Sequence, residues 1–105
     1  MPFGRRGAAP SEINGVSLKK ITGTTAAAEG GTVTVAHGLV LSQIIGWTLN
    51  VEATASSCIA QGNSATPGFE IQAFPDVTNF TVENDSANSE LVLSKPFTIL
   101  IFYAP

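Results

Sequence analysis

The sequence predicts an all-β fold, an antiparallel β-sandwich of about six or seven strands preceded by an extended N-terminal arm. Three observations lead to this prediction. Apolar and polar residues alternate with period two in several segments, turn-forming residues cluster between those segments, and no stretch has the 3.6-residue period of a helix. Because the chain has 105 residues, we expect a single domain over residues 18–105, with residues 1–17 forming the arm.

The arm is predicted from its composition and charge. It contains several Pro and Gly residues and no periodic apolar pattern, so alone it buries too little surface to offset its ordering entropy. The first twenty residues contain four basic residues and one acidic residue, a net charge of +3, whereas the remainder contains one basic and seven acidic residues, a net charge of −6. We expect the arm to bind an acidic partner, with Phe3, Arg5 and Arg6 as anchoring residues. Its charge equally allows the arm to fold back onto its own acidic domain.

Seven segments are predicted to be strands, each bounded by turn-forming residues: 17–25, 32–36, 43–55, 69–74, 80–84, 90–94 and 95–104. In the longest segment, Gly46 beside Trp47 indicates a β-bulge or a close backbone approach. The alternation places a set of large apolar side chains inward as the predicted core: Val35, Ile45, Trp47, Leu49, Val51, Phe69, Ile71, Phe80, Val82, Leu91, Ile99 and Ile101.

The last segment is apolar on both of its faces. Ile99 and Ile101 share one face with their period-two neighbours, whereas Leu100 and Phe102 lie on the other. A strand that is apolar on both faces needs cover on both. One cover is the facing sheet, and we expect the second to be a neighbouring subunit. Charged residues make up only 12% of the chain, against about 25% in ordinary globular proteins. These features predict a homo-oligomer, with a trimer favoured.

His37, the single histidine, is the first candidate for chemistry. Nucleophilic catalysis needs a nucleophile, a base and an orienting group, and no local signature such as G-x-S-x-G surrounds any Ser or Cys58. We therefore expect no enzyme activity and no catalytic residue. We expect His37 and Gly38 to form a structural turn at a strand end. One His and one Cys cannot complete a four-ligand zinc site, so no metal or cofactor is expected; a site shared on a trimer axis, with one His37 per subunit, is the alternative.

Two polar stretches offer possible contacts. Asp76, Asn79, Asn84 and Asp85 are candidates for contacting a carbohydrate or a host surface. Residues 84–90 also contain oxygen ligands that calcium accepts, although the glycine and spacing of an EF-hand loop are missing. The alternative for this second stretch is a solvated polar loop.

Several classes of function are excluded on composition. The acidic remainder lacks the clustered Lys and Arg that nucleic-acid binding needs. No segment approaches the roughly 20 apolar residues of a membrane span, so no membrane insertion is expected. The single cysteine excludes an intrachain disulfide, and the N-terminal residues lack the apolar run of a secretory signal.

The motifs resemble those of small β-sandwich modules in phage fibre and virion proteins, which are similar to the H-type lectin fold. The resemblance covers residues 20–103 and is carried by ITGTTAAAEGGTVTVAHGLVLSQIIGWTLNVE, followed later by LSKPF and ILIFY. It implies a trimeric structural protein of a virion, of the head-fibre, decoration or tail-spike type, bound to capsid or tail proteins through its arm. The alternative is a small lectin-like protein, cytoplasmic or extracellular, that binds a host surface glycan.

Overall fold

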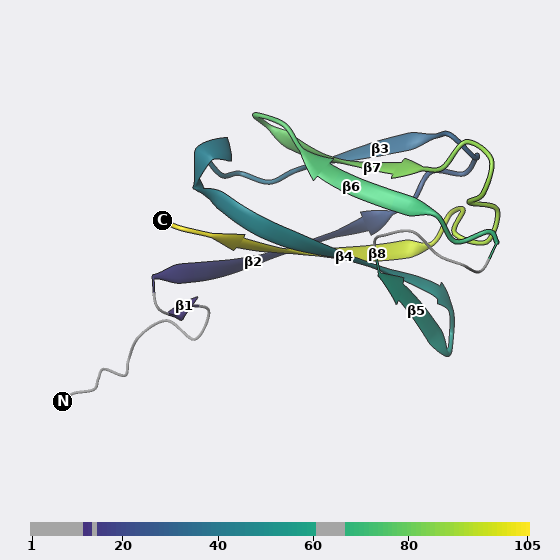
Figure 1. The fold of residues 1–105 in the computed structure, drawn as a ribbon, viewed down its shortest axis with the longest axis horizontal. Coiled ribbons are helices and arrows are strands. Elements are labelled where there is room, and N and C mark those ends of the chain that lie inside the picture. The colour runs from purple at the N-terminus through teal and green to yellow at the C-terminus, as the bar shows by residue number, and fades with distance from the viewer. Residues whose placement is uncertain (1–11, 14, 61–66) are drawn as a thin grey trace.

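The computed structural model describes residues 12–13, 15–60 and 67–105. Their strands form two antiparallel sheets, one ordered β1-β2-β8-β4-β5 and the other β3-β7-β6, which we term the large and the small sheet (Figure 1). The strands are β1 (Glu12–Ile13), β2 (Val16–Thr24), β3 (Thr32–Ala36), β4 (Ile44–Thr54), β5 (Ser57–Ala60), β6 (Ile71–Pro75), β7 (Asn79–Asn84) and β8 (Pro96–Tyr103), with the 3-10 turn η2 (Leu41–Gln43) before β4.

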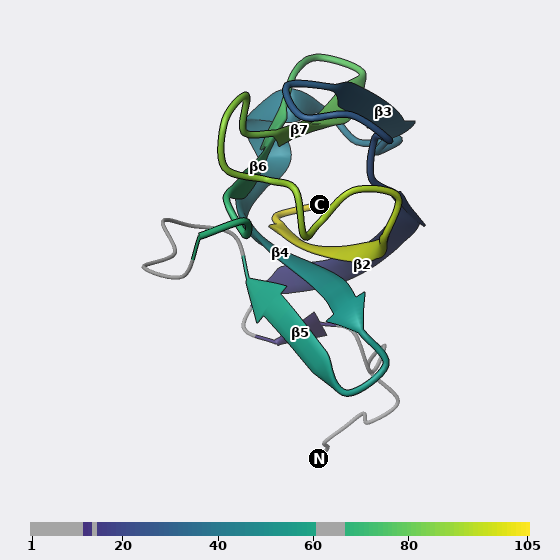
Figure 2. The same cartoon turned by 90° about the vertical axis from the view of Figure 1, so that its right-hand side faces the viewer.

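The predicted fold class is confirmed. Two layers of antiparallel strands pack face to face, and no described residue belongs to an α-helix (Figure 2). Apart from β1, which has two residues, the described part of the chain forms seven strands, within the predicted range. Among the described residues, none lies in a helix that could span a membrane.

A single apolar core fills the space between the sheets. In the large sheet, Ile99 of the central strand β8 lies between Ile21 and Leu49 of its two neighbours. In the small sheet, the central strand β7 contributes Phe80 and Val82. The buried members are Ile21, Leu49, Val51, Ile71, Ala73, Phe80, Val82, Val92, Phe97, Ile99 and Ile101, with Val35, Trp47 and Phe69 partly buried against them. The core prediction is thus confirmed at ten of its twelve positions.

The prediction is wrong for Ile45 and Leu91, which are 60% and 48% exposed. The pairing of β4 with β8 shifts register between Ile44 and Gly46, so the bulge predicted at Gly46 exists. Because a bulge adds one residue to one strand, it reverses the alternation on its N-terminal side, and Ile44 packs against the core instead of Ile45. Leu91 is not in a strand, and its neighbour Val92 is the buried residue.

Three further features of the strands differ from the prediction. Residues 90–94 form turns rather than a strand, and Ser94 has the left-handed φ of +53°. β5 was not predicted; it pairs with the end of β4 and forms an edge of the large sheet. β2 begins at Val16 and β1 pairs with it, so the sheet already includes the last residues of the predicted arm.

Candidate functional site

His37 lies directly after β3 and is completely buried. Its Nδ1 atom accepts a hydrogen bond from the Leu39 backbone N–H at 3.0 Å, so the proton of the neutral ring resides on Nε2. Nε2 donates to the Asp76 carbonyl at 2.9 Å. The ring also packs edge-on against Phe80, with centroids 5.9 Å apart. Both ring nitrogens are therefore engaged by the backbone.

The backbone of His37 makes hydrogen bonds to two other segments of the chain. Its N–H donates to the Thr78 carbonyl at 3.1 Å, and its own carbonyl accepts from Lys19 Nζ at 2.6 Å. Lys19 comes from β2 in the other sheet. Gly38 has a φ of +68°, and a Cβ built there would lie 2.8 Å from Lys19 Nζ. Glycine therefore suits both the backbone conformation and the space at this turn.

The β6–β7 turn beside His37 is held by Asp76. Its side chain accepts hydrogen bonds from the backbone N–H groups of Thr78 at 2.8 Å and Asn79 at 2.7 Å. These bonds stabilise the carboxylate and hold the pKa of Asp76 below its usual value of 3.8. Because the Asp76 side chain is directed at its own turn and its carbonyl at His37, the turn is fixed from both sides.

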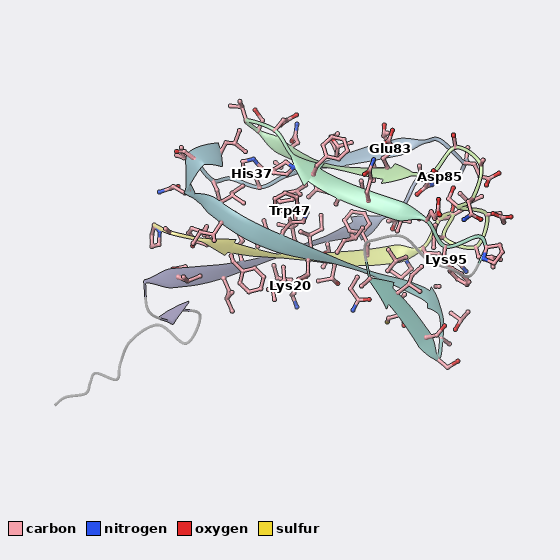
Figure 3. The ribbon with its side chains drawn as sticks, viewed as in Figure 1. Lys20, His37, Trp47, Glu83, Asp85 and Lys95 are labelled. Atoms are coloured by element: carbon pink, nitrogen blue, oxygen red, sulfur yellow. The ribbon has the colours of Figure 1, made fainter. Side chains whose placement is uncertain are left out.

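Trp47 connects the two sheets. Its indole N–H donates to the carbonyl of Ala73 in β6 at 2.9 Å, and its ring packs edge-on against Phe80 at 5.5 Å. Figure 3 shows Trp47 and His37 in the layer between the sheets. The predicted inward orientation of Trp47 is confirmed, and its position in the layer makes it unsuitable as an exposed platform for a sugar.

The opposite end of β7 contains a second buried polar side chain, Asn84, which is 1% exposed. Its amide nitrogen donates to the carbonyls of Ala26 and Ala28 at 3.0 and 3.1 Å. Thr25 acts similarly nearby, donating to the Val92 carbonyl at 2.5 Å and accepting from the Lys95 N–H at 2.8 Å. These contacts bind the β2–β3 loop to the end of β7 and to the loop before β8.

Asn84 Oδ1 has no hydrogen-bond partner among the described residues. Exchanging the two ends of the amide would place an oxygen against two carbonyls, so the observed orientation is the favourable one. A buried oxygen without a hydrogen-bond partner lowers the stability of the folded state. No group of three or more His, Cys, Asp or Glu side chains in the described part of the chain is placed to hold a metal ion.

The four predicted contact residues do not form one surface. Asn79 and Asn84 are the first and last residues of β7, roughly 17 Å apart at about 3.3 Å per residue. Asp76 lies beside Asn79 and Asp85 beside Asn84. The four residues instead form two separate pairs, at opposite ends of the small sheet. Asn84 is also buried, so its side chain is not available at the surface. The anchoring residues predicted at positions 3, 5 and 6 lie outside the described residues.

Three partly exposed apolar side chains lie on the side of the large sheet that faces away from the small sheet. Leu18 of β2 pairs with Phe102 of β8, and Leu100 lies two residues along the same face. We call these three residues the outer patch. Opposite Phe102 on β4 is Gly46, where a Cβ would meet nothing within 4 Å. Figures 1 and 2 show no described layer across this face, and the nearest charged side chain on it, Lys20, points away from the core (Figure 3).

Comparison with known proteins finds no match: no protein-family model, no curated protein and no solved structure is significantly similar to the chain. The resemblance to phage fibre modules is therefore carried by the sequence motifs alone.

Sequence reasoning missed the roles of Asn84 and Lys19, although a signal for each was present. Asn84 continues the period-two series of Phe80 and Val82, which places it inward. Lys19 alternates with Ile21 in the same way. Nothing in the sequence indicated that Thr25 would join two loops, because both of its partners lie about 70 residues further along the chain.

Proposed function

We propose that this protein is a non-enzymatic structural module that self-associates, as a trimer, through the outer patch, and that it serves as a component of a virion. The observation that supports self-association is the composition of the outer face of the large sheet. Two leucines and a phenylalanine lie on that face in β2 and the central strand β8, where an antiparallel sheet facing water normally presents polar residues. A second subunit would remove this apolar surface from water, at about 25 cal/mol for each Å² buried.

The geometry around His37 favours a structural role for this residue. A general base must present a nitrogen lone pair to a substrate. Here Nδ1 accepts from Leu39, Nε2 donates to Asp76, and the side chain is completely buried. The ring supports the end of β3 and the neighbouring turn. It thereby fixes the end of β3 against the β6–β7 turn.

The virion assignment has a separate basis. It rests on the TGTT, HGL and LSKPF motifs, which lie in β2 and its following loop, directly after β3, and at the start of β8. All three positions are places where a strand begins or ends. Motifs of this type would preserve a particular sandwich, and a structural protein built from repeated subunits needs such a fixed shape.

Self-association is tested with two matched variants. Leu100→Glu places a charge in the outer patch, whereas Phe74→Glu places one on the outer face of the small sheet, where Phe74 is 42% exposed. We expect sedimentation velocity to show an oligomer for the wild type and Phe74→Glu, and at least tenfold weaker association for Leu100→Glu. Circular dichroism checks that both variants fold. An oligomer that tolerates Leu100→Glu, or that is lost in Phe74→Glu, would contradict the proposed interface.

A further inference from the structure

Gly46 differs from the other described glycines because its own subunit gives no reason for a glycine there. A positive φ, which favours glycine, occurs at Gly15, Gly30, Gly38 and Gly68. A Cβ would lie 2.6 Å from Phe97 Cζ at Gly23 and 2.8 Å from Ala26 Cβ at Gly31. Gly46 has no positive φ, and a Cβ built there would meet no described atom within 4 Å. A glycine inside a strand weakens the strand and often marks a close approach of another group.

The bulge in β4 places Ile45 beside Gly46 on the outer face of the large sheet. Ile44 packs against the core, and Gly46 pairs with Phe102, whose side chain lies on the outer face. Because the register shifts between Ile44 and Gly46, Ile45 and Gly46 both lie on this outer face. Ile45 is 60% exposed. A projecting apolar side chain therefore stands next to a position that has no side chain.

Gly46 also adjoins the outer patch. Leu18 pairs with Phe102 across β2 and β8, and Phe102 pairs with Gly46 across β8 and β4, so the three residues form one row on the outer face. The space over Gly46 is thus bordered by Phe102 across the strand pair and by Ile45 along the strand. Apolar neighbours on both sides suit an apolar occupant.

We propose that the space over Gly46 receives the Ile45 side chain of a neighbouring copy of this chain. The inference rests on the proposed function, because it identifies one contact within the proposed trimer. Adjacent residues that face a rotation axis make such a contact repeat: Ile45 of each subunit meets Gly46 of the next, and the third subunit closes the ring. Neither residue carries a charge, so three copies can meet at one axis without repulsion between like charges.

The first test fills the space. Gly46→Val should weaken association of the full-length protein at least tenfold in sedimentation velocity, because the added side chain occupies the place of the neighbour's Ile45. Ala60→Val is the matched control, since Ala60 is exposed and pairs with Asn50, four residues or roughly 13 Å along β4 from Gly46. This control should associate within about twofold of the wild type.

A stability measurement separates contact between subunits from a role within one subunit. Adding Gly46→Val to the Leu100→Glu variant, in which association is already weakened, should leave the urea midpoint unchanged or raise it, because valine favours strands more than glycine does. A lower midpoint would mean that the subunit itself needs the space over Gly46, which would overturn the proposal.

The second test removes the projecting side chain. Ile45→Ala should weaken association at least fivefold, whereas Val77→Ala, at a β6–β7 turn residue that is 75% exposed, should leave it within about twofold. In a mixture of labelled and unlabelled protein, an isotope-filtered nuclear Overhauser contact is expected between the Ile45 methyl groups of one chain and the Gly46 Hα atoms of another. An oligomer without that contact would overturn the proposal.

The outcomes also separate this inference from the proposed function. A wild-type oligomer that Leu100→Glu weakens but Gly46→Val does not would overturn the Ile45–Gly46 contact alone. A wild type that is monomeric at every concentration would overturn both the contact and the proposed self-association.

Discussion

The two sheets resemble each other on their inner faces and differ on their outer ones. Both line the core with large apolar residues at every second position. On its outer face the small sheet carries mainly polar side chains, such as Gln72, which donates to Glu83 at 2.7 Å. The large sheet carries the outer patch, Leu18, Leu100 and Phe102, on β2 and the central strand β8.

The two outer faces therefore differ in how well their composition suits exposure to water. An antiparallel sheet that faces solvent alternates apolar and polar residues, as the small sheet does. The central strand β8 instead has consecutive large apolar residues from Ile99 to Tyr103. Nothing in the sandwich itself requires them on the outer face, because Ile99 and Ile101 already supply the core. Contact with another subunit is the role we assign to them.

The largest expected effect comes from the core that the two sheets share. Phe80 is completely buried and packs against both His37 and Trp47. Phe80→Ala should lower the free energy of unfolding by about 3–5 kcal/mol, because it leaves a cavity between the sheets. Urea denaturation measures this loss, and Phe74→Ala on the outer face of the small sheet is the matched control, expected to cost less than about 1 kcal/mol. Equal losses in the two variants would mean that the inner and outer faces of the small sheet are not distinct.

Removal of the His37 ring is expected to act mainly on the small sheet. His37→Ala leaves the Leu39 N–H and the Asp76 carbonyl without partners, and we expect a loss of about 3 kcal/mol. His37→Gln should cost about 1–2 kcal/mol, because its amide can still donate and accept. Urea denaturation of both variants gives the comparison. If His37→Ala were as stable as the wild type, the ring would have no role in holding the sheet.

The smallest expected effect is a change in the acid sensitivity of the β6–β7 turn. The folded state lowers the pKa of Asp76, so its ionised form contributes stability that is present above the unfolded value near 3.8 and lost as pH falls through the lower folded value. Asp76→Asn should remove this component of the pH dependence below pH 4. Carboxyl NMR titration gives the folded pKa directly. A midpoint at or above 3.8 would contradict the role of the Thr78 and Asn79 amides.

The sequence predicted the sandwich and most of its core because period-two alternation is a local property. Leu49, Val51, Phe80 and Val82 are buried as their alternation requires. The error at Ile45 has a different origin. Alternation indicates which residues share a face only within an uninterrupted strand, and the bulge before Gly46 interrupts β4. The glycine showed that a bulge was plausible, but not which of Ile44 and Ile45 would face inward.

The features that sequence did not predict depend on contacts between distant segments. The burial of Val92 rather than Leu91 is decided by loops that pack around Thr25, whose hydroxyl donates to the Val92 carbonyl. The placement of Asp76 and Asn84 at opposite ends of one strand also required the actual bounds of β7. His37 was predicted to bond to backbone at a strand end, but Asp76, its partner, could be identified only from the folded chain.

We propose that the outer patch is a contact surface between copies of this chain. The most direct measurement is the mass of the full-length protein by light scattering, over at least a hundredfold range of concentration. We expect a mass of about 33 kDa, three times the 10.9 kDa of one chain, at the upper concentrations. A mass of 10.9 kDa throughout the range would show that the chain is a monomer, which contradicts self-association through the outer patch.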